Sequence, residues 1–175
     1  MIDFSFKDIQ SIKQLDELAT FLHFLNLGYK NYDDWVEKAR FELSIEYKKA
    51  ITIHSEGKLV GDVIWQPHKS LPRTKEIKNI RVNPLAQGHG CAYFATKQAE
   101  LEDKEDYDLI VVDAPANKID VYSFLIQLGY KPIMTTPLYD GQTPDVFFVK
   151  SLKDNSKLTE VKEYITQKSH GLKDF

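Results

Sequence analysis

Apolar residues recur at helical spacing in two stretches near the start of the chain. A short extended segment, residues 2–6, precedes the first stretch, which predicts a helix that ends near Gly28. The second predicted helix begins after Asn31-Tyr32-Asp33-Asp34, whose aspartates are suited to capping free backbone N–H groups. Its apolar face comprises Trp35, Val36, Ala39 and Leu43. Two consecutive helices are therefore expected before any long strand.

From residue 50 the pattern becomes that of strands. Residues 50–53 and 59–65 are β-branched and apolar, and the turn Glu56-Gly57 between them predicts a hairpin. Residues 76–82 form a further strand, which Asn83-Pro84 ends because proline has no N–H to donate to a ladder. A glycine-bearing turn then leads into a helix over residues 90–101, with a small-residue face suited to close packing on a sheet, made of Ala92, Ala95 and Ala99.

The second half of the chain continues the alternation. Residues 108–112 are a continuous apolar run, typical of a strand covered on both sides. Asn117 is predicted to open a helix that Gly129 closes, and residues 130–134 and 146–149 then form a last antiparallel pair. The polar tail carries a weak helical pattern through Leu158, Val161 and Ile165. We therefore predict an α/β (α+β) fold, a mixed sheet flanked by helices.

Length and composition narrow the class of protein. The 175 residues fit a single domain, and 42% hydrophobic residues can fill a sizeable core. The formal net charge is −3, without blocks of basic residues, which argues against a nucleic-acid reader. The one cysteine, Cys91, favours a reducing cytoplasm, and no segment approaches the ~20 apolar residues of a membrane span. We expect neither an export signal nor a membrane anchor.

The turn between the third strand and its helix has a composition suited to binding a phosphate. It reads Gln87-Gly88-His89-Gly90-Cys91-Ala92 and places two glycines before a helix N-terminus, where free N–H groups and the helix dipole favour a phosphate. A P-loop is excluded because its Gly-Lys-Ser/Thr ending is missing, and the Rossmann glycine pattern is incomplete. A tight turn without a ligand is the alternative.

This turn resembles motif A of the GNAT superfamily of N-acetyltransferases, which has the pattern Arg/Gln-x-x-Gly-x-Gly/Ala. Gln87, Gly90 and Ala92 match its three specified positions. Downstream, Asn117 and the helix end Leu128-Gly129-Tyr130 resemble motif B of the same superfamily. The resemblance covers residues 1–152, taken as the acetyltransferase domain, and leaves residues 153–175 as a polar tail with a short helix.

The resemblance implies a mostly antiparallel sheet whose fourth and fifth strands splay around acetyl-CoA. Its pantetheine arm would bond to main-chain groups, so that side-chain identity matters little there, and Asn117 would lie close to that arm. Its pyrophosphate would be held by N–H groups of the glycine turn. The cofactor-binding residues implied are Ile80, Arg81, Val82, Gln87, Gly88, His89, Gly90, Cys91, Ala92 and Asn117.

The catalytic residues are less clear than the cofactor residues. The superfamily often has a tyrosine acid where this chain has Leu125, so Tyr122, one helical turn earlier, is the candidate acid, with a core position as the alternative. Glu76 has the same strand parity as Ile80 and is the candidate base. A solvated edge charge is the alternative for Glu76, and Asp113 is a weaker candidate base.

Two residues of the glycine turn have further alternatives. Cys91 would gain thiolate character at a helix N-terminus, but we expect it to face the pyrophosphate or the sheet instead of acting as a nucleophile. His89 is interpreted as a loop residue close to a phosphate, and the five histidines show no ligand spacing, so no metal is predicted.

The resemblance also places an acceptor cleft between two loops, residues 28–34 and 136–144. Tyr29, Tyr32 and Tyr139, with nearby aspartates, suit a cationic primary amine, either a small molecule or an amine of a peptide or protein. The alternative is that the aspartates are helix caps and Trp35 is core.

The function implied is acetyl transfer by direct attack of the amine, and the alternative is a non-catalytic acyl-CoA-binding or regulatory module. A homodimer that uses the tail is left open.

Overall fold

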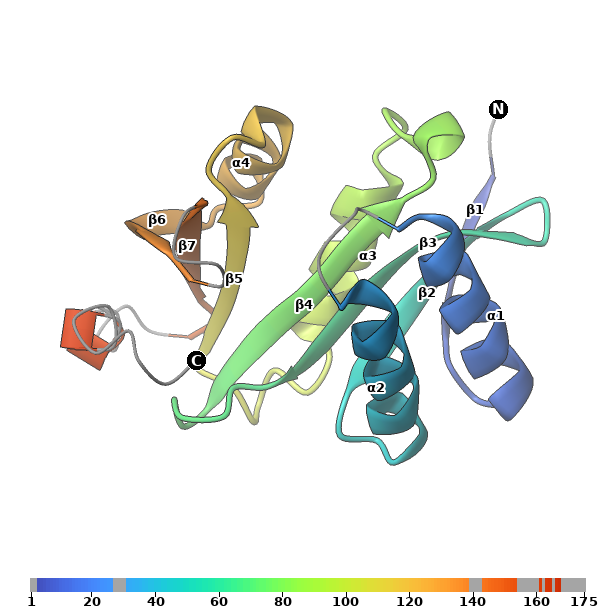
Figure 1. Ribbon diagram of the computed structural model, residues 1–175, viewed down its shortest axis with the longest axis horizontal. Coiled ribbons are helices and arrows are strands. Elements are labelled where there is room, and N and C mark those ends of the chain that lie inside the picture. The colour runs from blue at the N-terminus through green and yellow to red at the C-terminus, as the bar shows by residue number, and fades with distance from the viewer. Residues whose placement is uncertain are drawn as a thin grey trace. The chain divides into compact units, whose positions relative to one another are not determined.

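The computed structural model describes residues 3–26, 31–138 and 143–153, together with residues 161, 163, 164, 166 and 167. It contains a mixed seven-stranded sheet with the order β1-β2-β3-β4-β5-β7-β6, mostly antiparallel, in which β4 and β5 run parallel (Figure 1). The strands are β1 (Phe4–Asp8), β2 (Lys49–Ser55), β3 (Lys58–Pro67), β4 (Thr74–Val82), β5 (Leu109–Pro115), β6 (Lys131–Pro137) and β7 (Pro144–Ser151). The α helices are α1 (Ile12–Phe24), α2 (Tyr32–Ser44), α3 (Cys91–Leu101) and α4 (Ile119–Gln127). This arrangement confirms the predicted α/β class with a mixed, mostly antiparallel sheet.

The chain divides into two compact units, each built from segments that are not contiguous. Unit 1 comprises Met1–Pro67 and Lys78–Glu102, and unit 2 comprises His68–Ile77 and Asp103–Phe175. The first part of β4 therefore belongs to unit 2 and the rest of β4 to unit 1. None of the helices formed by the described residues has the length and apolar character needed to cross a membrane.

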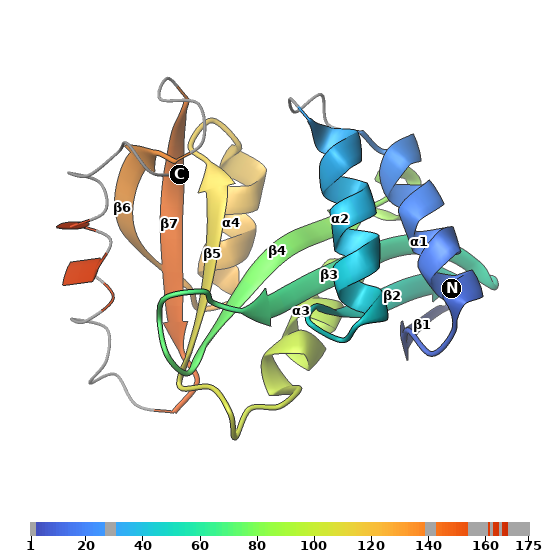
Figure 2. The ribbon, with the colours of Figure 1, turned by 60° about the horizontal axis from the view of Figure 1, so that its bottom comes forward.

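In unit 1, helices cover both faces of the strands (Figure 2). One face packs Ala50 and Ile64 against α1 and α2, which contribute Leu18, Leu22 and Val36. Because side chains alternate along a strand, the neighbouring residues point to the other face, where α3 packs on β2 and β3. The residues of α3 that become buried are Cys91, Ala95, Thr96, Ala99 and Glu100. The small-residue face predicted for this helix is thus buried at Ala95 and Ala99, whereas Ala92 is half-buried.

The starts of α1 and α2 differ in how they are capped. Ser11 caps α1, since its hydroxyl accepts a hydrogen bond from the Gln14 N–H at 3.3 Å. At the start of α2, Asn31 has a left-handed backbone with φ of 60° and makes no side-chain cap. The prediction that aspartates cap this helix is wrong, because the helix begins at Tyr32 and so places Asp33 and Asp34 inside its first turn. There their negative charge interacts favourably with the positive end of the helix dipole, but their side chains do not cap the helix.

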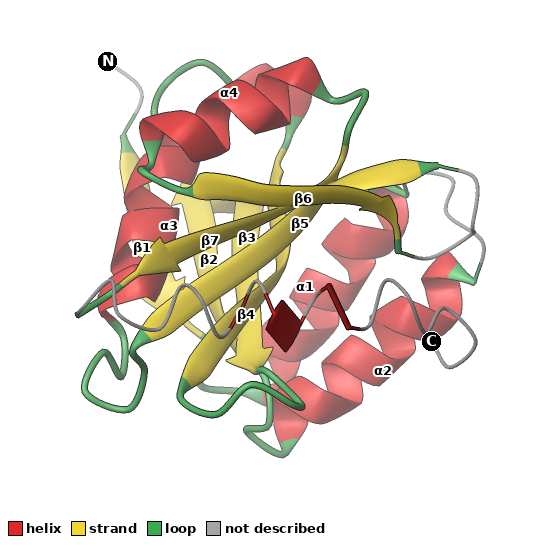
Figure 3. Ribbon diagram, turned by 90° about the vertical axis from the view of Figure 1, so that its left-hand side faces the viewer, coloured by secondary structure: helices red, strands yellow, loops and turns green. Residues whose placement is uncertain are grey.

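Unit 2 packs α4 and part of the tail onto opposite faces of its strands. Figure 3 shows α4 alongside β6 and β7, and the ring of Tyr122 in α4 lies 5.2 Å from that of Phe148. The adjacent residues Phe147 and Val149 point the other way, into a cluster that includes Val161 of the tail. Val161 is buried, so this part of the tail packs on the unit and is not a solvated extension; Leu158 and Ile165 lie outside the described residues.

Several predicted boundaries differ from the structure. The first helix ends at Phe24, and Gly28 lies outside the described residues. Asn117 does not open α4, since it lies in the turn after β5 and the position before the helix is Lys118. The last two strands are longer than predicted and pair as far as Pro137 and Pro144. Gly129 has φ of 90°, the left-handed conformation predicted for the end of α4.

Candidate functional site

The predicted phosphate turn connects β4 to α3 within unit 1. After β4, the Asn83 side chain accepts a hydrogen bond from the Leu85 N–H at 3.0 Å and starts the short 3-10 turn Pro84–Ala86. Gln87 is extended, and its side-chain amide donates to the Val82 carbonyl at 3.0 Å, which ties the turn to the strand end. Both glycines follow immediately, before the first turn of α3.

The two glycines have a backbone conformation that other residues adopt at a cost. Gly88 and Gly90 both have φ of 79°, in the left-handed region where a Cβ is strained. A Cβ on Gly90 would meet only the Phe94 ring, at 3.6 Å, whereas a Cβ on Gly88 would meet nothing within 4 Å. Gly88 therefore borders open space, and a side chain there would fill space that a bound group could otherwise use.

The glycine turn leads directly into the N-terminus of α3. Gly90 precedes the helix and supplies no side-chain cap, and the Phe94 N–H donates to the Gly90 carbonyl at 3.1 Å. The N–H groups of the first helical positions, Cys91 to Tyr93, have no carbonyl one turn earlier within the helix. Together with the positive end of the helix dipole, they make this turn suited to an anion such as a pyrophosphate.

The Cys91 side chain does not face outward from this turn. Its sulfur lies 3.6 Å from the Ala86 carbonyl, and the residue is only 2% exposed. Burial raises the pKa of the Cys91 thiol, and the N–H groups of Ala92 and Cys91 oppose this only in part. Burial thus opposes the thiolate character expected of an exposed cysteine at a helix N-terminus, and of the two expected orientations, toward the pyrophosphate or toward the sheet, the buried side chain favours the second.

His89 is exposed at the tip of the turn. Its Nδ1 lies 2.8 Å from the Gln87 carbonyl oxygen, and its ring lies 6.3 Å from that of Phe4. The hydrogen bond holds the imidazole against the backbone of the turn. This geometry agrees with its interpretation as a loop residue.

The three residues predicted to bind the pantetheine arm end β4. Ile80 is half-buried and Val82 is buried, but the side chain that departs from expectation is that of Arg81. Arg81 is only 8% exposed, and its guanidinium donates to the Leu25 carbonyl at 2.7 Å and to the Tyr32 hydroxyl. The expectation that side-chain identity matters little at this position is therefore wrong for Arg81, because the side chain joins β4 to both α1 and α2.

Tyr32, predicted to bind the acceptor, is a buried residue of unit 1. Its hydroxyl donates to the Leu22 carbonyl at 3.0 Å, and its ring stacks on Trp35 with centroids 5.7 Å apart. Burial is the main cause that raises the pKa of the Tyr32 hydroxyl, and Arg81 opposes it. The other predicted acceptor residues, Tyr29 and Tyr139, lie outside the described residues.

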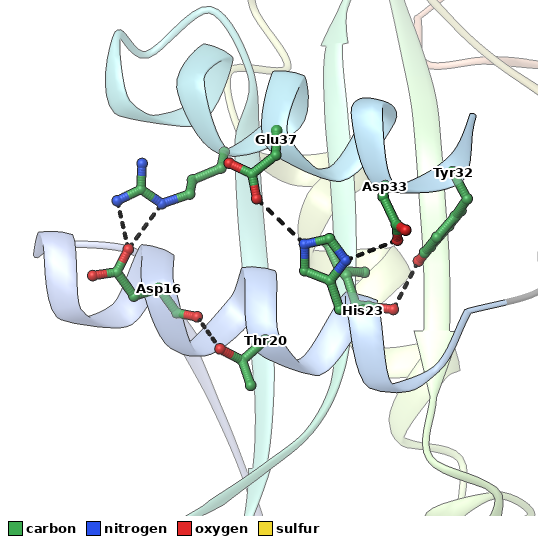
Figure 4. Close-up of polar contacts among 8 residues, drawn as sticks. Asp16, Thr20, His23, Tyr32, Asp33 and Glu37 are labelled. Carbon is green, nitrogen blue, oxygen red and sulfur yellow. Dashed lines mark hydrogen bonds and ion pairs between the residues drawn. The ribbon is translucent and has the colours of Figure 1, made fainter.

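A histidine joins α1 to the first turns of α2, close to Tyr32 (Figure 4). The His23 ring lies between Asp33 and Glu37, with Nδ1 3.0 Å from one carboxylate and Nε2 3.3 Å from the other. The hydrogen bond with Asp33, followed by that with Glu37, raises the pKa of His23. Asp33 thus has a partner within the unit, although it was expected to cap the helix or to face an acceptor.

Sequence reasoning gave no role to Asp62, the most deeply buried carboxylate of unit 1. Asp62 is 0% exposed in the middle of β3, and its Oδ2 accepts a hydrogen bond from the Asn79 amide at 2.5 Å. Its Oδ1 has no hydrogen-bond partner among the described residues. Burial raises the pKa of Asp62 to about 7. The signal in the sequence is one charged residue inside the apolar run of residues 59–65.

The remaining predicted residues belong to unit 2. Glu76 is half-buried in β4, where it pairs with Val111 of β5, so it is not a fully solvated edge charge. Tyr122 is 37% exposed on α4, which argues against the alternative of a core tyrosine. Leu125 is 0% exposed, Asp113 is half-buried in β5, and Asn117 is exposed. Among the described residues, no three His, Cys, Asp or Glu side chains form a group able to hold a metal ion.

Comparisons with known proteins give matches at the level of the fold. No protein-family model matches the chain, and no curated protein matches it by sequence. Many solved structures do match, among them one described as an acetyltransferase of the GNAT family from Desulfovibrio desulfuricans. The TM-score is 0.75 at 9% identity, over 86% of this chain and 99% of that chain.

Two further matches are similar in extent. The ribosomal-protein-S18-alanine N-acetyltransferase of Escherichia coli has a TM-score of 0.69 at 12% identity, over 89% of this chain and 97% of that chain. A protein of Salmonella typhimurium described as an acetyltransferase with its cofactor acetyl-CoA has a TM-score of 0.68 at 12% identity, over 87% and 96% of the two chains. The chain has the fold of the GNAT acetyltransferases.

Proposed function

We propose that the protein is an acetyl-CoA-dependent N-acetyltransferase that moves an acetyl group directly to a primary amine. The observation that carries the proposal is the glycine turn before α3, where Gly88 and Gly90 have φ of 79° and Gly88 borders open space. In a chain with this fold, that turn suits the pyrophosphate of acetyl-CoA. The E. coli and Salmonella matches are themselves named as acetyltransferases, which supports the same function for this chain.

We assign the cofactor contacts of unit 1 to backbone groups. N–H groups of the turn from Gln87 to Ala92 would hold the pyrophosphate, because they are donors at a helix N-terminus. Main-chain groups of Ile80, Arg81 and Val82 would bond to the pantetheine arm, and Asn117 is retained as a residue close to that arm. Acetyl-CoA would supply the acetyl group as a thioester.

The reaction requires a neutral amine and a proton donor. The amine attacks the thioester carbonyl carbon, loses a proton to a base, and CoA leaves as a thiol after receiving a proton from an acid. We assign the base to Glu76 and the acid to Tyr122. Tyr122 is 37% exposed and carries a hydroxyl that can donate a proton, whereas Leu125 at the superfamily's acid position has no proton to give.

The second candidate function is a non-catalytic acyl-CoA-binding module. It is favoured by the fully buried Leu125 at the position where many superfamily members carry the acid. Both candidates require CoA binding, and only the first requires CoA release with an amine. We expect a cytoplasmic location for either function, on the basis of the single cysteine.

The first test is thermal unfolding with acetyl-CoA, CoA, ATP or NAD at 1 mM. A ligand that binds only the folded protein raises its stability by about 2.7 kcal/mol at a hundred times its Kd, or roughly 5–10 °C for a chain of this size. We expect a rise with acetyl-CoA and CoA and none with ATP or NAD. No rise with either CoA compound would contradict both candidate functions.

A matched pair of variants tests the turn itself. Gly88 and Gly57 have φ of 79° and 76°, and a Cβ on either would meet nothing within 4 Å. Gly88→Ala and Gly57→Ala should therefore lose similar stability, about 1–2 kcal/mol. Only Gly88→Ala should weaken acetyl-CoA binding in calorimetry, by at least about tenfold, because only that methyl group enters the proposed phosphate site. Equal affinities in the two variants would contradict this location of the cofactor.

A further inference from the structure

A row of polar residues, with Asp62 and Arg81 buried and Asn79 half-buried, crosses unit 1 beneath α1 and α2. Asn79 of β4 donates through its amide nitrogen to Asp62 of β3 at 2.5 Å, and its amide oxygen lies 3.4 Å from Nη2 of Arg81. Asp62 and Arg81 are both buried, so this row is part of the interior of the unit. Buried polar groups of this kind are costly unless they are bonded, so their arrangement is well determined.

Arg81 connects this row to the C-terminal end of α1 and to the N-terminal end of α2. Its Nη1 donates to the carbonyl of Leu25, which follows the last residue of α1, at 2.7 Å. A cation at this position interacts favourably with the negative end of the helix dipole. The same group donates to the hydroxyl of Tyr32, the first residue of α2, and the guanidinium lies 5.3 Å from the Tyr32 ring. One side chain of the sheet thus fixes the end of α1 and the start of α2.

Asp62 determines which way the Asn79 amide points. An ionised carboxylate only accepts hydrogen bonds, so the NH₂ group of Asn79 faces Asp62 and its oxygen is left for Arg81. A protonated or amidated residue 62 offers a donor as well, and then both orientations of Asn79 become acceptable. The groups whose charge acts on Asp62 or responds to it are Arg81 of β4 and Tyr32 of α2, while the paired residue of β2 is Thr52, which does not ionise.

We propose that Asp62, Asn79 and Arg81 are positioning residues that set the first turn of α2, with Tyr32, Asp33 and Asp34, for binding of a cationic amine. The binding part of this inference rests on the proposed acetyltransferase function. The positioning part rests only on the contacts above. Asp34 supplies negative charge beside which a cationic acceptor would bind, and Asp33, whose side chain stays 72% exposed while it bonds to His23, adds to it.

Tryptophan fluorescence tests the positioning part without any substrate. Trp35 stacks on Tyr32, whereas Trp65 is 2% exposed, so acrylamide quenching chiefly reports on Trp35. Arg81→Met and Asp62→Asn should raise the quenching constant about twofold, and Arg81→Lys should lie between them and the wild type, because lysine keeps the charge but not the fork of donors. Wild-type quenching should also rise as the pH falls through about 7, and this rise should be smaller in Asp62→Asn, in which His23, bonded to Asp33 of the same helix turn, still titrates.

Arg40→Met is the matched control. Arg40 also joins α2 to α1, through Nε to the Asp16 carboxylate at 2.8 Å, but Asp16 lies in the first half of α1, away from Leu25. This control should leave the quenching of Trp35 and the kinetics unchanged. Unchanged quenching in both Asp62→Asn and Arg81→Met would overturn the positioning role.

Kinetics test the acceptor part, with spermidine, glucosamine and a peptide with an N-terminal alanine as the probe amines. Asp62→Asn should raise KM for an amine that is turned over by about tenfold, with kcat and KM for acetyl-CoA within about threefold of the wild type. Altered quenching with an unchanged amine KM would overturn the acceptor role and leave the positioning role standing. No turnover of any probe by the wild type would contradict the proposed function itself, and the fluorescence would still decide the positioning role.

Discussion

Two buried cations of unit 1 fasten the two ends of α2 to the sheet. Arg81 binds the hydroxyl of Tyr32 at the start of the helix. Lys48 binds the Glu42 carboxylate near the end of the helix and Oε1 of Gln66 in β3 at 2.6 Å. Burial lowers the pKa of Lys48, and the hydrogen bond with Glu42 opposes that change. Removing the hydrogen-bond partners of Arg81 or of Lys48 would leave a buried positive charge unpaired, which is strongly destabilising.

The proposed catalytic residues give a prediction at the scale of single residues. Glu76→Gln and Tyr122→Phe each remove one proton-transferring group while keeping nearly the same shape. If Glu76 is the base and Tyr122 the acid, kcat/KM should fall by about 10²-fold or more in each variant. Asp120→Asn, an exposed change in the first turn of the same helix as Tyr122, is the control and should retain full activity. Rates within twofold of the wild type in both variants would remove these two assignments.

At the scale of elements, β3 and β4 approach each other closely at Gly61. A Cβ on Gly61 would lie 2.6 Å from the Arg81 carbonyl oxygen and 3.0 Å from Cδ1 of Ile53. The first contact is with backbone, which cannot rotate away as a side chain can. The strand that carries Asn79 and Arg81 is therefore held at a spacing that only glycine permits.

Gly61→Ala should consequently strain the pairing of β3 with β4. We expect a loss of about 2 kcal/mol in the free energy of unfolding, since added atoms in a tightly packed site force the backbone to shift. Lys58→Ala, at the exposed start of the same strand, should change that free energy by no more than about 0.5 kcal/mol. Urea unfolding of the two variants decides the point, and a Gly61→Ala protein as stable as the wild type would contradict the close approach.

How far the sequence predicts these elements depends on the range of the interactions. Gly129 and the hairpin of β2 and β3 are set by local conformation and periodicity, and both were predicted. The contacts of Arg81 join residues separated by 56 and 49 positions, to Leu25 and Tyr32, and no local pattern reports them. Tyr32 was for this reason expected to bind the acceptor, whereas in the structure its hydroxyl is bonded to Arg81. The glycine turn was recognisable because its positive φ values demand a rare residue at fixed spacing.

At the scale of the whole molecule, several ionisable groups make stability depend on pH. Asp62 and His23 both have a raised pKa and so bind protons more tightly in the folded chain. Their contributions to stability are greatest at low pH and are lost as the pH rises, for His23 through values above 6.5. His54 has the opposite sign, because burial lowers its pKa. The dependence of the wild type on pH is the sum of such contributions, so a difference between variants is needed to isolate one of them.

Asp62→Asn provides that difference. The Asp62 carboxyl has an ordinary pKa of 3.8 and a pKa of about 7 in the folded protein, so between these values folding takes up a proton and wild-type stability falls as the pH rises. The asparagine cannot ionise and lacks this loss. The free energy of unfolding of Asp62→Asn relative to the wild type should therefore increase by about 2 kcal/mol between pH 4.5 and pH 8, allowing for half of the full shift. Urea unfolding at four pH values measures this increase, with the exposed Asp120→Asn change as the control for loss of one charge.

A difference in unfolding free energy that stays flat from pH 4.5 to pH 8 would show that Asp62 ionises in its ordinary range. Its carboxylate would then be bonded or solvated in a way that the contacts with Asn79 and Arg81 do not provide.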